Sequence, residues 1–213
     1  MSATETRIST PPGGHAAVYD AFMWPFERAA VGGWRRRLAT RARGRVLEIG
    51  AGTGSQLRWY APGAAVTALE PDAGMVARAR RRAAGAAADI RFVEGRAEEL
   101  PFGAASFDTA VSVFSLCTIA EPAEALSELR RVLVPGGSLL LLEHVHLPWE
   151  PARSLQSRAA PSWAAFAGGC RLDRDTVRFA QEAGFNVLRS CSHVFGWIVE
   201  VSARSPLGLR PRG

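Results

Sequence analysis

The sequence contains no lysine, although it has 26 basic residues among 213 and a net charge of +6. All of its basic residues are therefore arginine. This absence excludes a short-chain dehydrogenase, because that class of enzyme needs a catalytic lysine. It also leaves arginine as the source of fixed positive charge on any binding surface.

Cysteine is scarce, and long apolar runs are missing. Cys117, Cys170 and Cys191 show no CxxC or Cys/His spacing, so we expect reduced thiols, no disulfide framework and no metal. No apolar run approaches the roughly 18 residues of a membrane span. The N-terminus also lacks the pattern of a signal peptide. We therefore expect a cytoplasmic protein without a membrane span.

Arginine clusters at 35–37 and 78–82 raise the question of a nucleic-acid surface. Nucleic-acid binding needs a basic face, ideally with interleaved aromatic residues. These arginines fall on the outer faces of expected helices, without aromatic residues interleaved among them. We favour solvated helix faces and no nucleic-acid partner; the alternative is an anionic membrane or substrate.

Hydrophobic periodicity alternates between strand and helix along the middle of the chain. The strands are apolar on both faces, which is typical of a parallel sheet covered by helices on both sides. The pattern predicts an α/β, doubly wound sheet that ends in a strand hairpin hinged near Phe195. Strands are expected at 45–50, 65–70, 90–95, 107–114 and 138–145, with the hairpin at 186–204, and helices at 55–61, 72–84, 121–133 and 174–185.

Composition divides the chain into one domain with loose ends. Pro25 and the pair Gly32-Gly33 break the segment before the core into two short helices. The expected divisions are a disordered N-terminus at 1–14, a single domain at 15–204 and a flexible tail at 205–213. Within the domain they are a helical lid at 15–43, a cofactor-binding core at 44–146 and a substrate-side segment with the hairpin at 147–204.

The run RVLEIGAGTG, residues 45–54, is an apolar strand that ends in an acid and three alternating glycines. Glycine lacks a Cβ, so we expect a group other than protein to approach the backbone at Gly50, Gly52 and Gly54. In an open parallel sheet, ligands bind beyond the carboxyl ends of the strands, which is where this glycine turn is expected to lie. Glu70 ends the second strand about 20 residues after the first glycine, where an acid can accept both hydroxyls of a ribose. A bound nucleoside follows.

The spacing distinguishes two nucleoside cofactors, NAD and S-adenosylmethionine. The dinucleotide pattern G-x-G-x-x-G faces a pyrophosphate, whereas this chain has G-A-G-T-G with Glu48 two residues before the first glycine. A carboxylate there would repel a pyrophosphate but suits the amino and sulfonium groups of S-adenosylmethionine. The alternative for Glu70 is a structural role as a cap for the helix that follows Pro71.

Five segments carry a family resemblance: VLEIGAGTG (46–54), VTALEPD (66–72), GRAEELPF (95–102), SFDTAVSVFSL (106–116) and ELRRVLVPGGSLLLLEH (128–144). In them the chain resembles the class I S-adenosylmethionine-dependent methyltransferases. The resemblance implies a Rossmann-like sheet of seven strands, one of them antiparallel, with an N-terminal helical lid. It also implies that S-adenosyl-L-methionine is converted to S-adenosyl-L-homocysteine without a metal. The expected cofactor-binding residues are Glu48, Gly50, Ala51, Gly52, Gly54, Glu70, Pro71, Ala97, Glu98, Val113 and Phe114.

Further segments, among them SLCTI (115–119), EHV (143–145) and GGCRLDRDTVRFAQEAGF (168–185), resemble the methyltransferase-like group that includes alkyl-thiol S-methyltransferases. Two departures stand out. Arg96 replaces the Asp of many relatives, so the adenine contact is expected from Ala97 or Glu98, and the membrane segment of animal relatives is missing. The expected substrate pocket comprises Tyr19, Trp24, Cys117, His144, Trp149 and Trp163.

His144 ends the fifth strand at the ligand edge, where it can act as a general base or bond to the backbone of a loop. S-methylation of a small hydrophobic thiol is the favoured reaction. O- or N-methylation of a small metabolite, methylation of a lipid or quinone, and a non-catalytic S-adenosylmethionine-binding module are the alternatives. A base-modifying enzyme is disfavoured, because SVFSL stands where its Asn/Asp-Pro-Pro-Tyr motif would be. The oligomeric state stays open.

Overall fold

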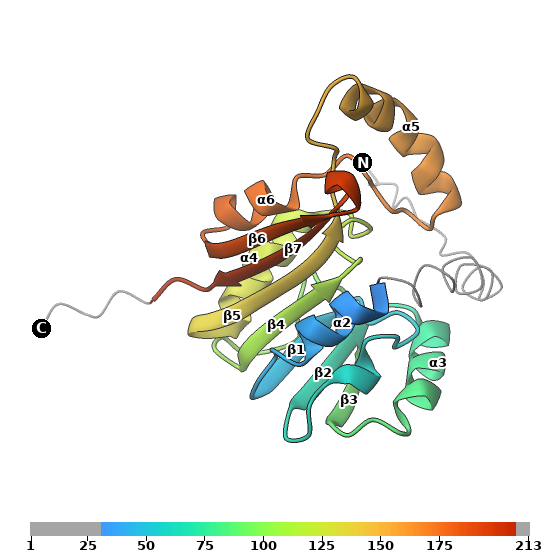
Figure 1. Cartoon of the computed structure of the whole chain (residues 1–213). Coiled ribbons are helices and arrows are strands. Elements are labelled where there is room, and N and C mark those ends of the chain that lie inside the picture. The colour runs from blue at the N-terminus through green and yellow to red at the C-terminus, as the bar shows by residue number, and fades with distance from the viewer. Residues whose placement is uncertain (1–30, 208–213) are drawn as a thin grey trace, which may run out of the picture.

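The computed structural model describes residues 31–207 (Figure 1), in which a single sheet of seven strands forms the centre. The strand order is β3-β2-β1-β4-β5-β7-β6. Strand β7 runs antiparallel to both of its neighbours, and the other pairs are parallel. The Rossmann-like sheet with one antiparallel strand and a terminal hairpin is therefore confirmed. The strands are β1 Arg45–Ile49, β2 Ala65–Glu70, β3 Asp89–Glu94, β4 Phe107–Val113, β5 Leu133–His144, β6 Asn186–His193 and β7 Ile198–Arg204.

Helices cover both faces of the sheet, as the doubly wound pattern predicts. Helices α2 and α3 and the short 3-10 turn η2 lie over one face, and α4 and α6 lie over the other (Figure 1). Helix α5 stands apart, beyond the ends of the central strands. The helices are α2 Gly32–Ala39, η2 Leu57–Trp59, α3 Ala73–Ala83, α4 Pro122–Val132, α5 Ala152–Phe166, α6 Thr176–Glu182 and the 3-10 turn η3 Val194–Gly196.

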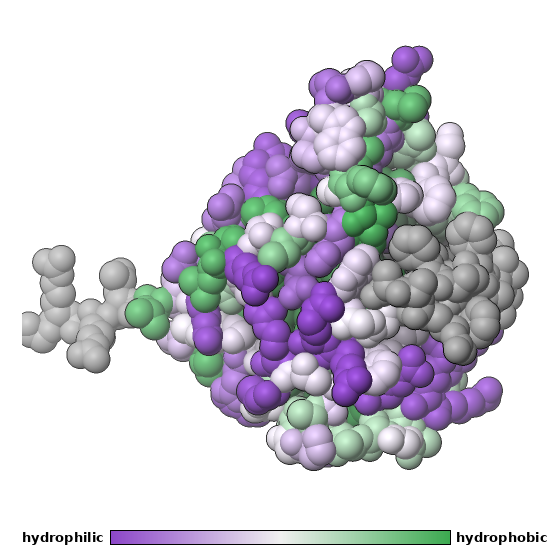
Figure 2. All heavy atoms as spheres, viewed as in Figure 1, coloured by the Kyte–Doolittle hydropathy of each residue, from purple (hydrophilic) through white to green (hydrophobic). Residues whose placement is uncertain are grey.

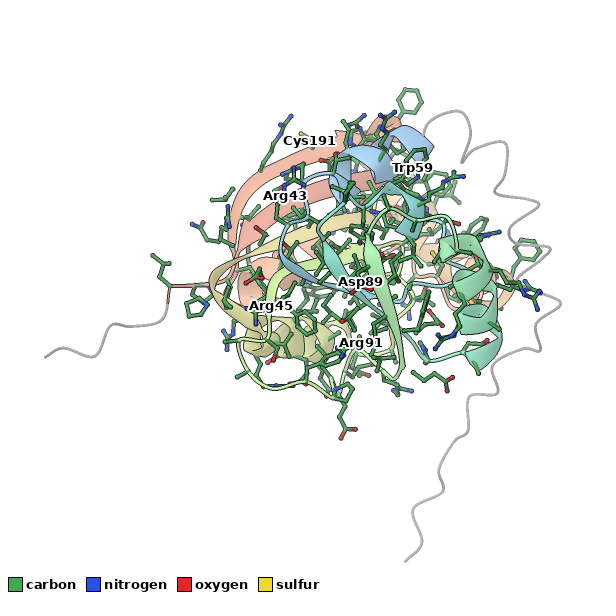
Figure 3. All side chains as sticks on the ribbon, turned by 90° about the horizontal axis from the view of Figure 1, so that it is seen from below. Arg43, Arg45, Trp59, Asp89, Arg91 and Cys191 are labelled. Atoms are coloured by element: carbon green, nitrogen blue, oxygen red, sulfur yellow. The ribbon has the colours of Figure 1, made fainter. Side chains whose placement is uncertain are left out.

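The central parallel strands are buried on both faces, as is usual in parallel sheets. In β1, β2 and β4 nearly every residue is buried, because each strand is covered on both faces. The outer strands β3 and β6 are half exposed. Figure 3 shows Asp89 and Arg91 on β3, and such charged side chains discourage edge-to-edge pairing with another chain.

Three helices begin or end at residues that favour helix termini. Asp72 caps α3, since its Oδ1 accepts a hydrogen bond of 2.8 Å from the Met75 backbone N–H. Asp175 caps α6 in the same way through the Arg178 N–H, and Pro122 occupies the first turn of α4. Gly184 ends α6 with a φ of 87°.

One expectation about a helix was wrong, since the segment 55–61 forms the 3-10 turn η2 instead of a helix. Helix α2 begins at Gly32, and the segment before residue 31 lies outside the described residues. The stretch 147–170 holds the 15-residue helix α5, with Pro161 inside it. Its content of proline and tryptophan hid an alanine-rich run that is long enough to form four turns.

The arginine clusters lie on helix surfaces, as expected, but several guanidinium groups contact aromatic rings. Arg36 lies 5.8 Å from the ring centroid of Trp59, and Arg80 lies 4.8 Å from that of Phe92. Hydrophilic side chains spread over the face that carries α2 and α3 (Figure 2). No helix among residues 31–207 is long and apolar enough to cross a membrane.

Candidate functional site

The carboxyl ends of β1, β2, β4 and β5 meet at one edge of the sheet, and the glycine turn follows β1 there. Gly50, Gly52 and Gly54 have φ values of 58°, 55° and 82°. Residues with a side chain rarely adopt this left-handed region. The conformation of the turn therefore depends on glycine at all three positions.

The surroundings of the three glycines differ. A Cβ on Gly50 would lie 2.4 Å from the Ser115 Cβ, and a Cβ on Gly54 would lie 2.9 Å from the Ala79 Cα. A Cβ on Gly52 meets no atom of the described residues closer than 4.0 Å. Protein therefore fills the Cβ direction at Gly50 and Gly54, which by itself accounts for glycine at these two positions. Gly52 is the position that leaves room for a ligand.

This difference predicts opposite outcomes for two alanine substitutions. Gly50→Ala should destabilise the fold by about 2–4 kcal/mol, because it adds the clash with Ser115 to the cost of a left-handed residue. Gly52→Ala meets only the backbone cost of about 1–2 kcal/mol, but its methyl group enters the proposed cofactor space. Denaturant unfolding and calorimetry of cofactor binding measure the two effects. A Gly52→Ala variant that binds like the wild type would contradict this placement.

Glu70 lies at the end of β2 and is 7% exposed. Its Oε2 accepts a hydrogen bond of 2.8 Å from the Gly52 N–H, and its Oε1 accepts one of 3.2 Å from the Asp72 N–H. Burial raises the pKa of the carboxyl, and the two backbone N–H groups oppose the rise. The carboxylate thus lies beside the open glycine.

Glu48 is the second carboxylate at this edge and is 2% exposed. The Tyr60 hydroxyl donates a hydrogen bond of 2.7 Å to its Oε2. Burial raises the pKa of Glu48 to about 7, and the nearby charge of Glu70 adds to the rise, while Tyr60 and the charge of Arg35 lower it. An acid with such a pKa titrates near neutral pH, so it can respond to a cationic ligand.

The expected adenine contacts lie after β3. Ala97 is buried, and Glu98 accepts a hydrogen bond of 3.0 Å from Arg96. Arg96, the residue that departs from the family pattern, therefore occupies an oxygen of the Glu98 carboxylate. The backbone at Ala97 is left as the simpler contact for adenine.

Phe114 follows β4 and has a φ of 55°, a conformation that a phenylalanine rarely adopts. Its ring lies 4.6 Å from the imidazole of His144, and the Arg35 guanidinium lies 5.3 Å from the Phe114 ring centroid. Val113, the residue before it, is buried at the end of β4. The strained backbone turns the aromatic ring toward the end of β5.

His144 ends β5 beside two sulfur atoms. Its Nδ1 lies 3.7 Å from the Cys117 Sγ and 3.5 Å from the Cys170 Sγ. The two Sγ atoms are 3.5 Å apart, and both thiols are buried. Hydrogen bonding from Cys117 and the neighbouring imidazole lowers the pKa of Cys170 to about 5, while the pKa of Cys117 is raised. We call these three residues the Cys-His-Cys cluster.

Glu143 holds the loop after β4 in place, and the sequence reasoning missed its role. Its side chain is fully buried, and its Oε1 accepts a hydrogen bond of 2.6 Å from the Ser112 hydroxyl. The backbone N–H groups of Ser115, Leu116 and Cys117 also donate to the carboxylate. These bonds position Cys117 next to His144. A buried acid directly before a candidate histidine was the available signal.

The aromatic residues expected to line the substrate pocket do not all lie in one place. Trp163 on α5 packs against Cys117 and Cys170, and its buried indole N–H lies toward the Cys170 sulfur. Trp149 is 47% exposed. Tyr19 and Trp24 lie outside the described residues, and Pro71 is exposed at the start of the loop after Glu70.

Comparison with known proteins decides the family. The sequence profile of the family described as "Methyltransferase domain" matches residues 47–141, which contain the glycine turn and the strands β2 to β4. The thiol S-methyltransferase TMT1B of Homo sapiens is 34% identical over 156 residues, which is 70% of this chain and 64% of that protein. The chain belongs to the class I S-adenosylmethionine-dependent methyltransferases.

A second curated relative and a solved structure also resemble the chain. The demethylmenaquinone methyltransferase of Thermus thermophilus is 39% identical over 117 residues, 52% of this chain and 53% of that protein. A putative methyltransferase structure from Bacillus halodurans covers 81% of this chain and 98% of its own, with a TM-score of 0.69 at 18% identity. This likeness shows the shared fold. The chain spans between about half and two thirds of the length of these curated relatives.

Proposed function

We propose that this methyltransferase-family chain transfers a methyl group from S-adenosylmethionine to a small hydrophobic acceptor, with a thiol favoured. The observation that carries the proposal is the open side of Gly52, whose N–H bonds to buried Glu70, with a second buried carboxylate, Glu48, close enough to interact with the charge of Glu70. One carboxylate can accept both hydroxyls of a ribose, and the other can offset the positive charge of the amino-acid end. A pyrophosphate would be repelled by both.

S-adenosylmethionine, when bound, supplies an electrophilic methyl group on a sulfonium. The chain's part is to align the acceptor with that methyl group and to exclude water, and alignment alone can supply much of the rate. Glu70, oriented by its hydrogen bond from the Gly52 N–H, would hold the sugar, and Glu48 the cationic end. Phe114 and His144 would form the wall between the cofactor side and the acceptor side.

The acceptor side favours a thiol. A thiol with a pKa near 8.5 loses its proton readily, so the site needs less basic assistance than it would for a phenol or a carbon nucleophile. The described groups next to His144 are sulfur and aromatic side chains, which suit a soft, apolar acceptor. The thiol S-methyltransferase relative, 34% identical over 156 residues, supports the same acceptor class. The demethylmenaquinone methyltransferase relatives support a quinone as the second candidate.

A panel of acceptors tests the proposal. Purified protein with S-adenosylmethionine is given alkyl and aryl thiols, phenols, amines and a short-chain demethylmenaquinone, and release of S-adenosylhomocysteine is measured. Turnover confined to thiols is the expected result. Turnover confined to the quinone would replace the thiol assignment. Cofactor binding without turnover on any acceptor would favour a regulatory module.

A further inference from the structure

The Cys-His-Cys cluster brings together three residues that are far apart in the sequence. Cys117 and His144 are 27 residues apart, and His144 and Cys170 are 26 apart. They meet because β4 and β5 are neighbours in the sheet and the segment after α5 returns to the same edge. The sequence-based expectation of no metal considered only local spacing, which such an arrangement does not produce.

We propose that Cys117, His144 and Cys170 bind a thiophilic divalent ion of the zinc type. Thiolate sulfur and imidazole nitrogen are the ligands that Zn²⁺ prefers. Within residues 31–207, these three residues form the one group of His, Cys, Asp or Glu side chains whose three ligand atoms all lie within 4.8 Å of one another.

The distances within the cluster fit a tetrahedral ion. Zinc bonds of about 2.3 Å to sulfur and about 2.0 Å to nitrogen place the ligand atoms of a tetrahedron roughly 3.5–3.8 Å apart. The observed separations are 3.5 Å between the two sulfurs, and 3.7 and 3.5 Å from them to the histidine nitrogen. A single ion can therefore contact all three atoms with little movement of the side chains.

The surroundings of the cluster support bound thiolates. Trp163 and Trp197 pack against the cysteines with buried indole N–H groups, and the Trp163 N–H lies toward the Cys170 sulfur. Buried N–H donors need an acceptor, and anionic sulfur ligands accept such bonds. Glu143 fixes the Cys117 backbone through a hydrogen bond of 3.2 Å, which orients one ligand.

Three protein ligands leave the fourth tetrahedral position to water or substrate, as in catalytic zinc sites. If the proposed function holds, Cys117, His144 and Cys170 would hold the ion, and the ion would supply a position at which an acceptor thiol could bind through sulfur and lose its proton to water. His144 would then be a ligand through Nδ1. In that state Nε2 carries the ring proton, so His144 would not act as the general base.

The test uses Co²⁺ and Zn²⁺ on the full chain, after reduction and chelation. Wild type is expected to bind one Co²⁺ with the strong ligand-field absorption of a tetrahedral site and a thiolate-to-cobalt charge-transfer band. Zn²⁺ should displace it. Cys117→Ser, Cys170→Ser and His144→Ala should each lose these bands, whereas the control Cys191→Ser, at a cysteine on the outer strand β6 (Figure 3), should keep them.

Folding and cofactor binding are measured on the same samples. Circular dichroism and S-adenosylhomocysteine calorimetry show whether a variant without metal is still folded, and where a variant fails to fold, the wild-type spectrum decides alone. Reduced wild type without a cobalt spectrum overturns the metal site, as does a spectrum that survives in both Cys→Ser variants. A cobalt site in a chain that binds no S-adenosylhomocysteine would leave the metal proposal intact and remove the proposed function.

Discussion

Replacing Glu70 with alanine should weaken binding of S-adenosylmethionine and S-adenosylhomocysteine at least tenfold. A hydrogen bond to a charged group contributes about 1.5–3 kcal/mol, and a tenfold loss corresponds to about 1.4 kcal/mol. Loss of a carboxylate that bonds to both ribose hydroxyls therefore removes more binding free energy than a tenfold loss of affinity requires. Both ligands carry the same ribose, so both should weaken to the same extent. Isothermal titration calorimetry measures the two dissociation constants.

Glu94 offers a matched control for this experiment. It ends β3, pairs in register with Glu70 on β2, and is exposed. Glu94→Ala removes the same charge from the same sheet edge, and binding should stay at the wild-type value. Glu70→Gln keeps an oxygen near the Gly52 N–H and so separates binding from folding. Wild-type affinity in Glu70→Ala, or equal losses in both alanine variants, would contradict the ribose assignment.

The second large effect is a pH dependence that arises from Glu48. Its pKa of about 7 in the folded protein means that half of the molecules carry a neutral acid at neutral pH. Affinity for the cationic S-adenosylmethionine should rise as pH increases from 6 to 8, because the carboxylate becomes charged. Glu48→Gln should bind about tenfold more weakly at pH 8 and lose the pH dependence, since one charge-assisted contact is removed.

The stability of the protein without cofactor should change in the opposite direction. The folded pKa of Glu48 is raised above the unfolded value of 4.5, so the folded state holds the proton more tightly. The contribution of this group is then present below pH 4.5 and is lost as pH rises toward 7. Urea unfolding of wild type and Glu48→Gln across this range gives the difference. A difference that does not fall with pH would contradict the raised pKa.

The sequence predicts most of the sheet because the central strands are buried on both faces. β1 and β2 show this as mainly apolar runs, and their ends are placed to within one residue. The helix expected at 55–61 fails because buried Leu57 and Tyr60 pack a tight turn against the sheet. Tertiary packing outweighs helical periodicity in so short a segment.

In the candidate site, too, some features can be predicted from local sequence and others cannot. The glycine turn and Glu70 are local signals, so their positions follow from a strand and the turn after it. What a Cβ would meet is not local: Ser115 reaches Gly50 from the loop after β4. The Cys-His-Cys cluster could not be predicted from the spacing of its residues in the sequence, because Cys117 and His144 become neighbours only through the order of the strands in the sheet.

The central claim is that the turn at Gly52, with Glu48 and Glu70, binds S-adenosylmethionine. Calorimetry of the purified chain with S-adenosylhomocysteine tests it most directly, because the product binds without turnover. We predict saturable binding of one ligand per chain, which Gly52→Ala and Glu70→Ala weaken and Glu94→Ala leaves unchanged. Absence of any binding heat with both S-adenosylhomocysteine and S-adenosylmethionine at several temperatures would contradict the account.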